Sequence, residues 1–171
     1  MSYHSRLSEK IMVAEKLLPI LNAARLKDNK IVFTNGCFDI LHRGHTEYLA
    51  KARDLGGVLV IGLNTDDSVR RQNKSPERPI NNEETRATIL AALEFVDFVV
   101  LFNEDTPYEL IKKIQPDILV KGADYDPNET NPTSKKYIVG SDIVRSKGGQ
   151  IKTIELTEGY STTGLIHKLK N

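Results

Sequence analysis

Five short apolar runs, separated by helical segments, constrain the fold of this chain more than any other feature. Four of the runs are nearly continuous in apolar residues, a pattern typical of strands covered on both faces of a parallel sheet. Strands and helices that alternate at this spacing form right-handed βαβ units. The sequence therefore predicts an α/β fold with a single Rossmann-like, doubly wound parallel sheet of about five strands and helices on both faces. The expected strands span residues 30–36, 58–64, 97–102, 117–122 and 150–156.

Helical patterns fill the intervals between the expected strands. Asn81 is a candidate N-cap with Glu84 three residues later, and Thr106 is a candidate N-cap followed by Pro107 in the first turn. The expected helices span residues 44–57, 81–96, 106–114, 141–149 and 161–170.

Residues 1–29 are expected to form an N-terminal helical extension, ahead of a main domain of residues 30–171. Apolar positions recur at helical spacing in residues 9–26, and Pro19 is expected to bend or break a helix there. We expect the extension to pack on the main domain.

The composition excludes several classes of protein. The 171 residues carry a net charge of +1, which indicates neither a membrane span nor a generic nucleic-acid binder. Cys37 is the one cysteine, so an intramolecular disulfide is impossible and a cytoplasmic location is expected. The first residues contain no apolar core, and we expect no secretion signal.

Ligands of doubly wound sheets bind beyond the carboxyl ends of the strands, so the residues that follow each strand are candidates for a site. These segments carry histidines, arginines, lysines, carboxylates, glycines and hydroxyl groups. Such a set suits a multiply charged phosphate better than an apolar ligand or a sugar alone. The segments are residues 34–45, 64–74, 121–127 and 157–163.

His42 and His45 stand three residues apart, directly after the first expected strand. They could bind a metal, pack without function, or clamp a phosphate. A metal needs a third ligand, but His4 and His167 lie in the terminal segments, and the pair is not the HExxH motif of a metalloprotease. The start of a helix favours anions, and imidazoles there can donate hydrogen bonds to phosphate oxygens. The pattern therefore favours the phosphate clamp.

Two motifs carry a resemblance to a known family. Residues 36–45, GCFDILHRGH, resemble the HxGH region of the nucleotidyltransferase superfamily, and residues 159–163, GYSTT, resemble its second signature. The segments that link these motifs are similar to the D-glycero-D-manno-heptose 1-phosphate adenylyltransferase branch of that superfamily. The resemblance implies that residues 30–171 form a cytidylyltransferase-like nucleotidyltransferase domain.

The resemblance implies a reaction in which heptose 1-phosphate attacks the α-phosphate of ATP, giving ADP-heptose and pyrophosphate. The attacking phosphate oxygen is already ionised at neutral pH. The reaction therefore needs positioning and charge stabilisation more than a side-chain nucleophile. Mg²⁺ is the expected cofactor, carried mainly by the triphosphate, and we assign no protein ligand to it.

The resemblance also implies roles for individual residues, although which of the basic residues after the second strand contacts phosphate stays open. The expected catalytic residues, which stabilise the phosphates, are His42, His45 and Lys74. The expected nucleotide-binding residues are Asn35, Gly36, Cys37, Phe38, Asp39, Gly44, Lys121, Gly122, Asp124, Tyr160, Ser161, Thr162 and Thr163. The expected acceptor-binding residues are Asn64, Asp66, Arg70 and Arg86.

One position departs from the wider superfamily. Many cytidylyltransferases carry arginine where this chain has Leu156, which favours the heptose branch over a glycerol 3-phosphate cytidylyltransferase. The expected partners are small molecules, ATP and heptose 1-phosphate, with neither nucleic acid nor membrane. A homodimer and a separate sugar kinase upstream are also expected from the resemblance.

Two alternatives remain open at this point. The first is a cytidylyltransferase for a polyol phosphate, or an enzyme for another small phosphate acceptor. The second is a non-catalytic nucleotide-binding module. A dinucleotide-dependent dehydrogenase and a P-loop kinase are disfavoured, because neither GxGxxG nor GxxxxGK[ST] follows the first strand.

Overall fold

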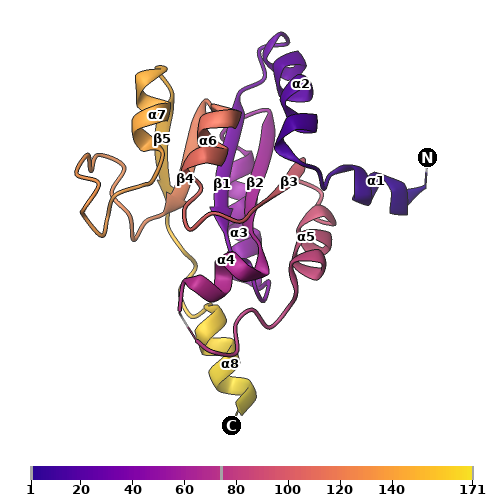
Figure 1. Cartoon of the computed structure of the whole chain (residues 1–171), viewed down its shortest axis with the longest axis vertical. Helices are drawn as coiled ribbons and strands as arrows, with labels where there is room; N and C mark the ends of the chain where they lie inside the picture. Colours follow the sequence, from indigo (N-terminus) through magenta and orange to yellow (C-terminus); the bar gives the residue numbers. More distant parts are fainter. Residues whose placement is uncertain (1, 74, 171) are drawn as a thin grey trace.

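The computed structural model of the protein describes residues 2–73 and 75–170. A five-stranded sheet forms its centre, with all strands parallel and the order β3-β2-β1-β4-β5 (Figure 1). This order reverses direction at β1, as doubly wound sheets do, and it confirms the predicted fold class. The strands are β1 (Ile31–Gly36), β2 (Val58–Asn64), β3 (Phe98–Phe102), β4 (Ile118–Gly122) and β5 (Gln150–Ile154).

Helices cover both faces of the sheet (Figure 1). One core cluster lies between the sheet and α1, α3 and α5, and the other lies between the sheet and α2, α6 and α7. The helices are α1 (Tyr3–Glu9), α2 (Ala14–Arg25), α3 (Arg43–Arg53), α4 (Asp66–Arg71), α5 (Glu83–Ala91), α6 (Tyr108–Ile114), α7 (Ser141–Ser146) and α8 (Thr162–Lys170).

The central strand β1 explains why the apolar runs are continuous. Ile31, Val32 and Phe33 are all fully buried. Ile31 and Phe33 point into the core under α2 and α6, whereas Val32 points into the core under α3 and α5. Since successive side chains of a strand face opposite sides, a strand with both faces covered needs apolar residues at every position.

The N-terminal segment departs in part from expectation. It packs on the sheet as predicted, and a backbone bridge from Ile11 to Val99 also ties it to the edge strand β3. The expected break at Pro19 is wrong, because α2 runs through this residue and turns its ring toward solvent.

Several helix starts also differ from the predicted ones. The side chain of Asn82, not that of Asn81, caps α5 by accepting a hydrogen bond from the Thr85 amide. Pro107, not Thr106, is the N-cap of α6, and it makes no side-chain cap bond. The short helix α4 was not expected, because its sequence is rich in charged residues and has too few apolar positions to show a helical period.

Candidate active site

A cleft of about 760 Å³ lies at the carboxyl ends of the strands, and segments that are distant in sequence meet there. Its volume is within the usual range for a small-molecule site. Fourteen of the residues predicted for the site line this cleft: Asn35, Gly36, Cys37, Phe38, His42, Gly44, His45, Asn64, Lys121, Gly122, Asp124, Tyr160, Ser161 and Thr162.

The two histidines lie against each other at the start of α3. Their ring centroids are 3.8 Å apart, with an angle of 19° between the planes. His42 is the N-cap of the helix, and its Nδ1 accepts a hydrogen bond from the backbone amide of His45 at 3.4 Å. An accepting Nδ1 carries no proton, so the proton of a neutral His42 is on Nε2 and can be donated to a ligand.

Burial keeps the histidine pair neutral at physiological pH. Desolvation is the main cause that lowers the pKa of His45, to about 4, and the neighbouring His42 lowers it further. A backbone hydrogen bond with Ile40 partly opposes this shift. Desolvation also lowers the pKa of His42. A polyphosphate close to the rings would favour their charged forms and reverse these shifts.

Two buried polar atoms in the cleft have no hydrogen-bond partner within the described part of the chain. They are Oδ1 of Asn35 and Nδ1 of His45. A buried polar atom without a partner costs about 1–3 kcal/mol, so such atoms mark positions that a ligand or solvent satisfies. Both residues line the cleft, which makes it a site built to receive a polar molecule.

The segment after β5 reaches the histidines from the other end of the chain. The ring centroids of His42 and Tyr160 are 6.3 Å apart. A Cβ atom built on Gly44 would lie 3.1 Å from both the His42 ring and Cβ of Tyr160, so glycine permits this close approach. Ser161 follows, and its Oγ accepts a hydrogen bond from the Gly164 amide at 3.0 Å. The histidines and the start of α8 therefore face the same cleft.

The end of β4 closes the cleft beside β1. Nζ of Lys121 lies 3.4 Å from the backbone oxygen of Asn35, to which it donates, and 5.6 Å from the centroid of the Tyr125 ring. Gly122 and Asp124 follow along the same edge. This part of the cleft combines a cation, an aromatic ring and exposed backbone, which suits a nucleoside.

Some predicted residues lie away from the cleft. Arg70 is exposed and paired with Asp67 at 2.8 Å, and it does not line the cleft, so its contact with the acceptor stays a prediction. Arg86 and Asp66 pair with each other at 2.7 Å, and neither lines the cleft. Lys74, a predicted catalytic residue, lies outside the residues that the structure describes.

Two further predicted residues do not line the cleft. The carboxylate of Asp39 is buried and accepts hydrogen bonds from the amides of Ile80 and Asn81 and from Arg78. In this structure it holds a neighbouring loop, and its contact with the nucleotide stays a prediction. Thr163 is exposed on α8, next to the cleft residue Thr162.

Other cleft residues were missed by the sequence analysis. Asp105 and Thr106 follow β3, and the strand-end argument applied to β3 would have found them. Gln72 lies at the end of the unexpected helix α4. Lys135 and Tyr137 come from the long segment between β4 and α7, where no local pattern marks a residue as part of a site.

Comparison with known proteins agrees with this geometry. A model of the cytidylyltransferase-like family matches residues 33–168, and the chain belongs to that family. The chain is 50% identical over 170 residues to the bifunctional protein HldE of Syntrophotalea carbinolica. It is 52% identical over 163 residues to the bifunctional protein HldE of Campylobacter jejuni subsp. doylei. The chain spans about a third of the length of these relatives, 33% and 32% respectively.

Two solved structures share the fold. A lipopolysaccharide core biosynthesis protein from Thermoplasma volcanium superposes with a TM-score of 0.57 at 27% identity, covering 78% of this chain and 99% of that one. A pantoate-β-alanine ligase from Francisella tularensis superposes with a TM-score of 0.59 at 18% identity, covering 90% of this chain and 69% of that one. The family match and the HldE relatives confirm the resemblance to nucleotidyltransferases. The solved structures confirm the Rossmann-like fold.

Along residues 2–73 and 75–170, no helix combines the length and the apolar character needed to cross a bilayer.

Proposed function

We propose that the protein transfers the adenylyl group of ATP to D-glycero-D-manno-heptose 1-phosphate and releases pyrophosphate. The observation that carries the proposal is the meeting of His42 and His45 with the start of α8 in one cleft. Membership of the cytidylyltransferase-like family supports the class of reaction. The HldE relatives and the lipopolysaccharide core biosynthesis protein support the sugar phosphate as acceptor.

The chemistry of the cleft residues suits this reaction. An oxygen of the sugar phosphate attacks the α-phosphorus of ATP, and the bond from that phosphorus to the oxygen bridging the α- and β-phosphates breaks. Nε2–H of His42 donates to the phosphate oxygens on which negative charge accumulates, and the hydroxyls of Ser161 and Thr162 bind the triphosphate. The amino end of α8 adds its partial positive charge there.

In this proposal the two substrates lie on opposite sides of β1. The nucleoside lies beside Lys121 and Asp124, after β4, and the sugar phosphate lies beside Gln72 and Thr106, after β2 and β3. The second group of residues offers amide and hydroxyl groups that match sugar hydroxyls. A Thr106→Val variant is expected to raise the KM for the sugar phosphate about tenfold and to leave the KM for ATP unchanged.

Mg²⁺ would act as the counter-ion of the triphosphate and supply charge stabilisation to the leaving pyrophosphate. Within the described part of the chain, no three histidine, cysteine, aspartate or glutamate side chains are grouped to hold a metal ion. We therefore propose that triphosphate oxygens and water hold the ion. A cytoplasmic homodimer and a sugar kinase that supplies the phosphorylated acceptor complete the proposal.

Pyrophosphate release tests the proposal directly. Purified protein, ATP and heptose 1-phosphate with Mg²⁺ are expected to release pyrophosphate and to form ADP-heptose in equal amounts. A panel with CTP, and with polyol phosphates as acceptors, separates the cytidylyltransferase alternative. ATP binding by calorimetry without turnover on any acceptor would support the non-catalytic module instead.

A further inference from the structure

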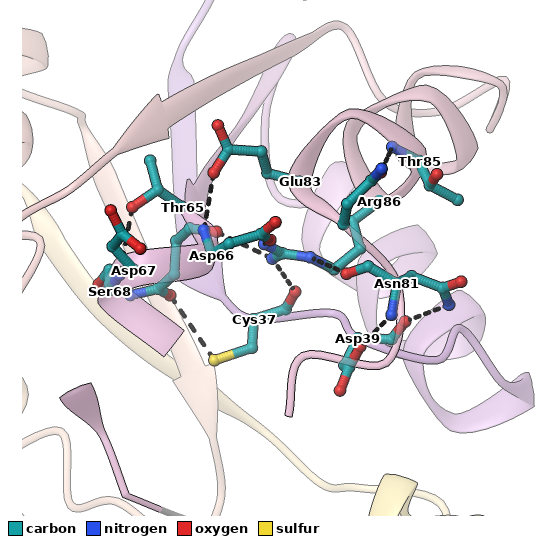
Figure 2. A network of polar contacts seen from close by, with 12 residues as sticks. Cys37, Asp39, Thr65, Asp66, Asp67, Ser68, Asn81, Glu83, Thr85 and Arg86 are labelled. Carbon is teal, nitrogen blue, oxygen red and sulfur yellow. Dashed lines mark hydrogen bonds and ion pairs between the residues drawn. The ribbon is translucent and has the colours of Figure 1, made fainter. Parts of the chain in front are cut away.

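Arg86 is a buried cation that the reaction scheme leaves without a task. Its residue is 1% exposed, and its guanidinium group lies among Cys37, Asp66 and Asn81 (Figure 2). Four hydrogen bonds engage its guanidinium group. Nη1 donates to the backbone oxygens of Cys37 at 2.7 Å and Asn64 at 2.8 Å, Nε donates to that of Asn81 at 3.0 Å, and Nη2 donates to the Asp66 carboxylate at 2.7 Å.

Two of these acceptors, the oxygens of Cys37 and Asn64, lie at the ends of the neighbouring strands β1 and β2. Cys37 comes directly after β1 and Asn64 is the last residue of β2, and both line the cleft. Main-chain oxygens cannot move without the strand that carries them. A guanidinium group that bonds both oxygens through one nitrogen therefore fixes the distance between the two strand ends.

A path of contacts leads from Arg86 to a histidine of the site. The Cys37 oxygen belongs to the peptide bond that joins Cys37 to Phe38. Phe38 adopts a left-handed backbone conformation with φ of 44°, which a bulky side chain rarely adopts without support. The Phe38 ring then packs edge-on against the His45 ring, with 5.3 Å between centroids.

A second ion pair fixes the other side of Phe38. The Asp39 carboxylate accepts from Nε of Arg78 at 3.0 Å. It also accepts from the amide of Asn81 at 3.0 Å (Figure 2). The Asn81 oxygen is in turn an acceptor of Arg86. Phe38 thus lies between Cys37, which is bonded to Arg86, and Asp39, which is bonded to Asn81.

We propose that Arg86 is a positioning residue that sets the orientation of His45 through the Cys37–Phe38 peptide bond. This role replaces the acceptor contact that the sequence suggested for Arg86. The inference rests on the proposed function, because the orientation of His45 is expected to affect the kcat of a nucleotidyl transfer.

A double-mutant cycle in kcat separates this role from a merely structural one. Arg86→Lys keeps the charge but cannot bridge the two strand ends, and it is expected to lower kcat 10- to 30-fold with less than a threefold change in the KM for ATP. In a His45→Asn background the same substitution is expected to lower kcat less than threefold, because the group it positions is gone. The inference would be overturned if the kcat loss of the double variant equalled the product of the two single losses. It would also be overturned if the Arg86→Lys enzyme kept the wild-type kcat.

Arg53→Lys is the matched control. Arg53 also donates to a backbone oxygen, that of Gly56, and pairs with Asp97 at 3.0 Å, but it lies at the amino ends of the strands. Its substitution is expected to change kcat less than twofold. If Arg86→Lys does not fold, Asp66→Asn takes its place in the cycle with the same expected result. If that variant also fails to fold, or its loss multiplies with that of His45→Asn, the inference is rejected.

A spectroscopic readout distinguishes this inference from the proposed function. If the wild-type protein releases no pyrophosphate with any acceptor, the proposed function fails, and the imidazole ¹⁵N signals then decide the inference without turnover. Arg86→Lys is expected to shift the His45 signals while those of His4 stay in place. Unchanged His45 signals in a folded Arg86→Lys protein would contradict the positioning role.

Discussion

The cleft has two sides of very different construction. The β1 side, residues 35–45, is buried or half-buried except at Arg43. A hydrogen bond from Arg86 to its backbone and the buried Asp39–Arg78 ion pair hold it in place. The C-terminal side, residues 155–163, is mostly exposed. Its side-chain ties include the Thr157 hydroxyl, which donates to Glu47 at 2.6 Å, and the Ser161 cap of α8.

This difference teaches which part of the site is formed before substrate arrives. The histidines are held in one geometry by the fold, as catalytic groups that stabilise a transition state need to be. The hydroxyl groups lie on a segment whose position costs little to change, because few contacts would be lost. We infer that the β1 side sets the rate and that the C-terminal side adds affinity for the nucleotide.

The largest expected effect comes from a histidine of the β1 side. His42→Asn keeps an N-cap for α3, because asparagine is a good cap, but removes the ring that faces the phosphates. We expect kcat/KM to fall about 10³-fold, in the range seen for loss of one preorganised donor. The steady-state rate of pyrophosphate release measures it, with the exposed His4→Asn as control. A loss below tenfold would contradict the comparison.

Breaking the ion pair behind the β1 side is expected to have the next largest effect. Asp39→Asn leaves Arg78 without a charge partner in a pair whose side chains are 0% and 11% exposed, and this is expected to destabilise the protein by about 3 kcal/mol. Glu47→Gln, on α3, weakens a tie to the C-terminal side and is expected to leave the unfolding midpoint unchanged, because its ion-pair partner Arg43 is exposed. Urea denaturation of both variants measures the difference, and equal midpoints would refute it.

The sequence predicted the sheet and most of the cleft for one physical reason. Continuous apolar strands and glycine-bounded helices fix a doubly wound topology, and that topology brings all strand ends to one edge. The segments containing His42 and Ser161 therefore met as expected, although more than a hundred residues separate them.

The differences between the predicted site and the cleft lining concern side chains whose direction depends on tertiary structure. Arg70, Arg86 and Asp39 were expected in the site because they follow strand ends or match family motifs. Sequence position does not reveal that Arg86 turns inward to backbone oxygens or that Arg70 turns outward to Asp67. Some cleft residues, such as Tyr137, come from the segment between β4 and α7. The sequence of this segment shows no helical or strand period, so no pattern could place them.

The pH dependence of stability provides a third test of the β1 side. The pKa of His45 is about 4 in the folded protein and near 6.5 when the chain is unfolded, so the unfolded state binds more protons between these values. Stability is therefore expected to fall by about 2 kcal/mol as the pH drops from 6.5 to 4. Urea denaturation across this range should show a smaller fall for His45→Gln, and an equal fall in both proteins would contradict a buried neutral His45.

The smallest expected effect comes from the C-terminal side. Ser161→Ala removes the cap of α8 and one hydroxyl from the cleft, and caps of this kind contribute about 1 kcal/mol. We expect the KM for ATP to rise about fivefold with kcat nearly unchanged, because the segment adds affinity rather than rate. Steady-state kinetics with Ser146→Ala as an exposed control checks this. A fall in kcat as large as that of His42→Asn would remove the distinction between the two sides.

A crystal structure with α,β-methylene ATP and Mg²⁺ tests the central claim most directly. We predict that the triphosphate lies within hydrogen-bond distance of His42 or His45 on one side and of Ser161 or Thr162 on the other. The segment 155–163 should move toward the β1 side, while residues 35–45 keep their present positions. A nucleotide bound to one of these groups with the other turned away would contradict the account.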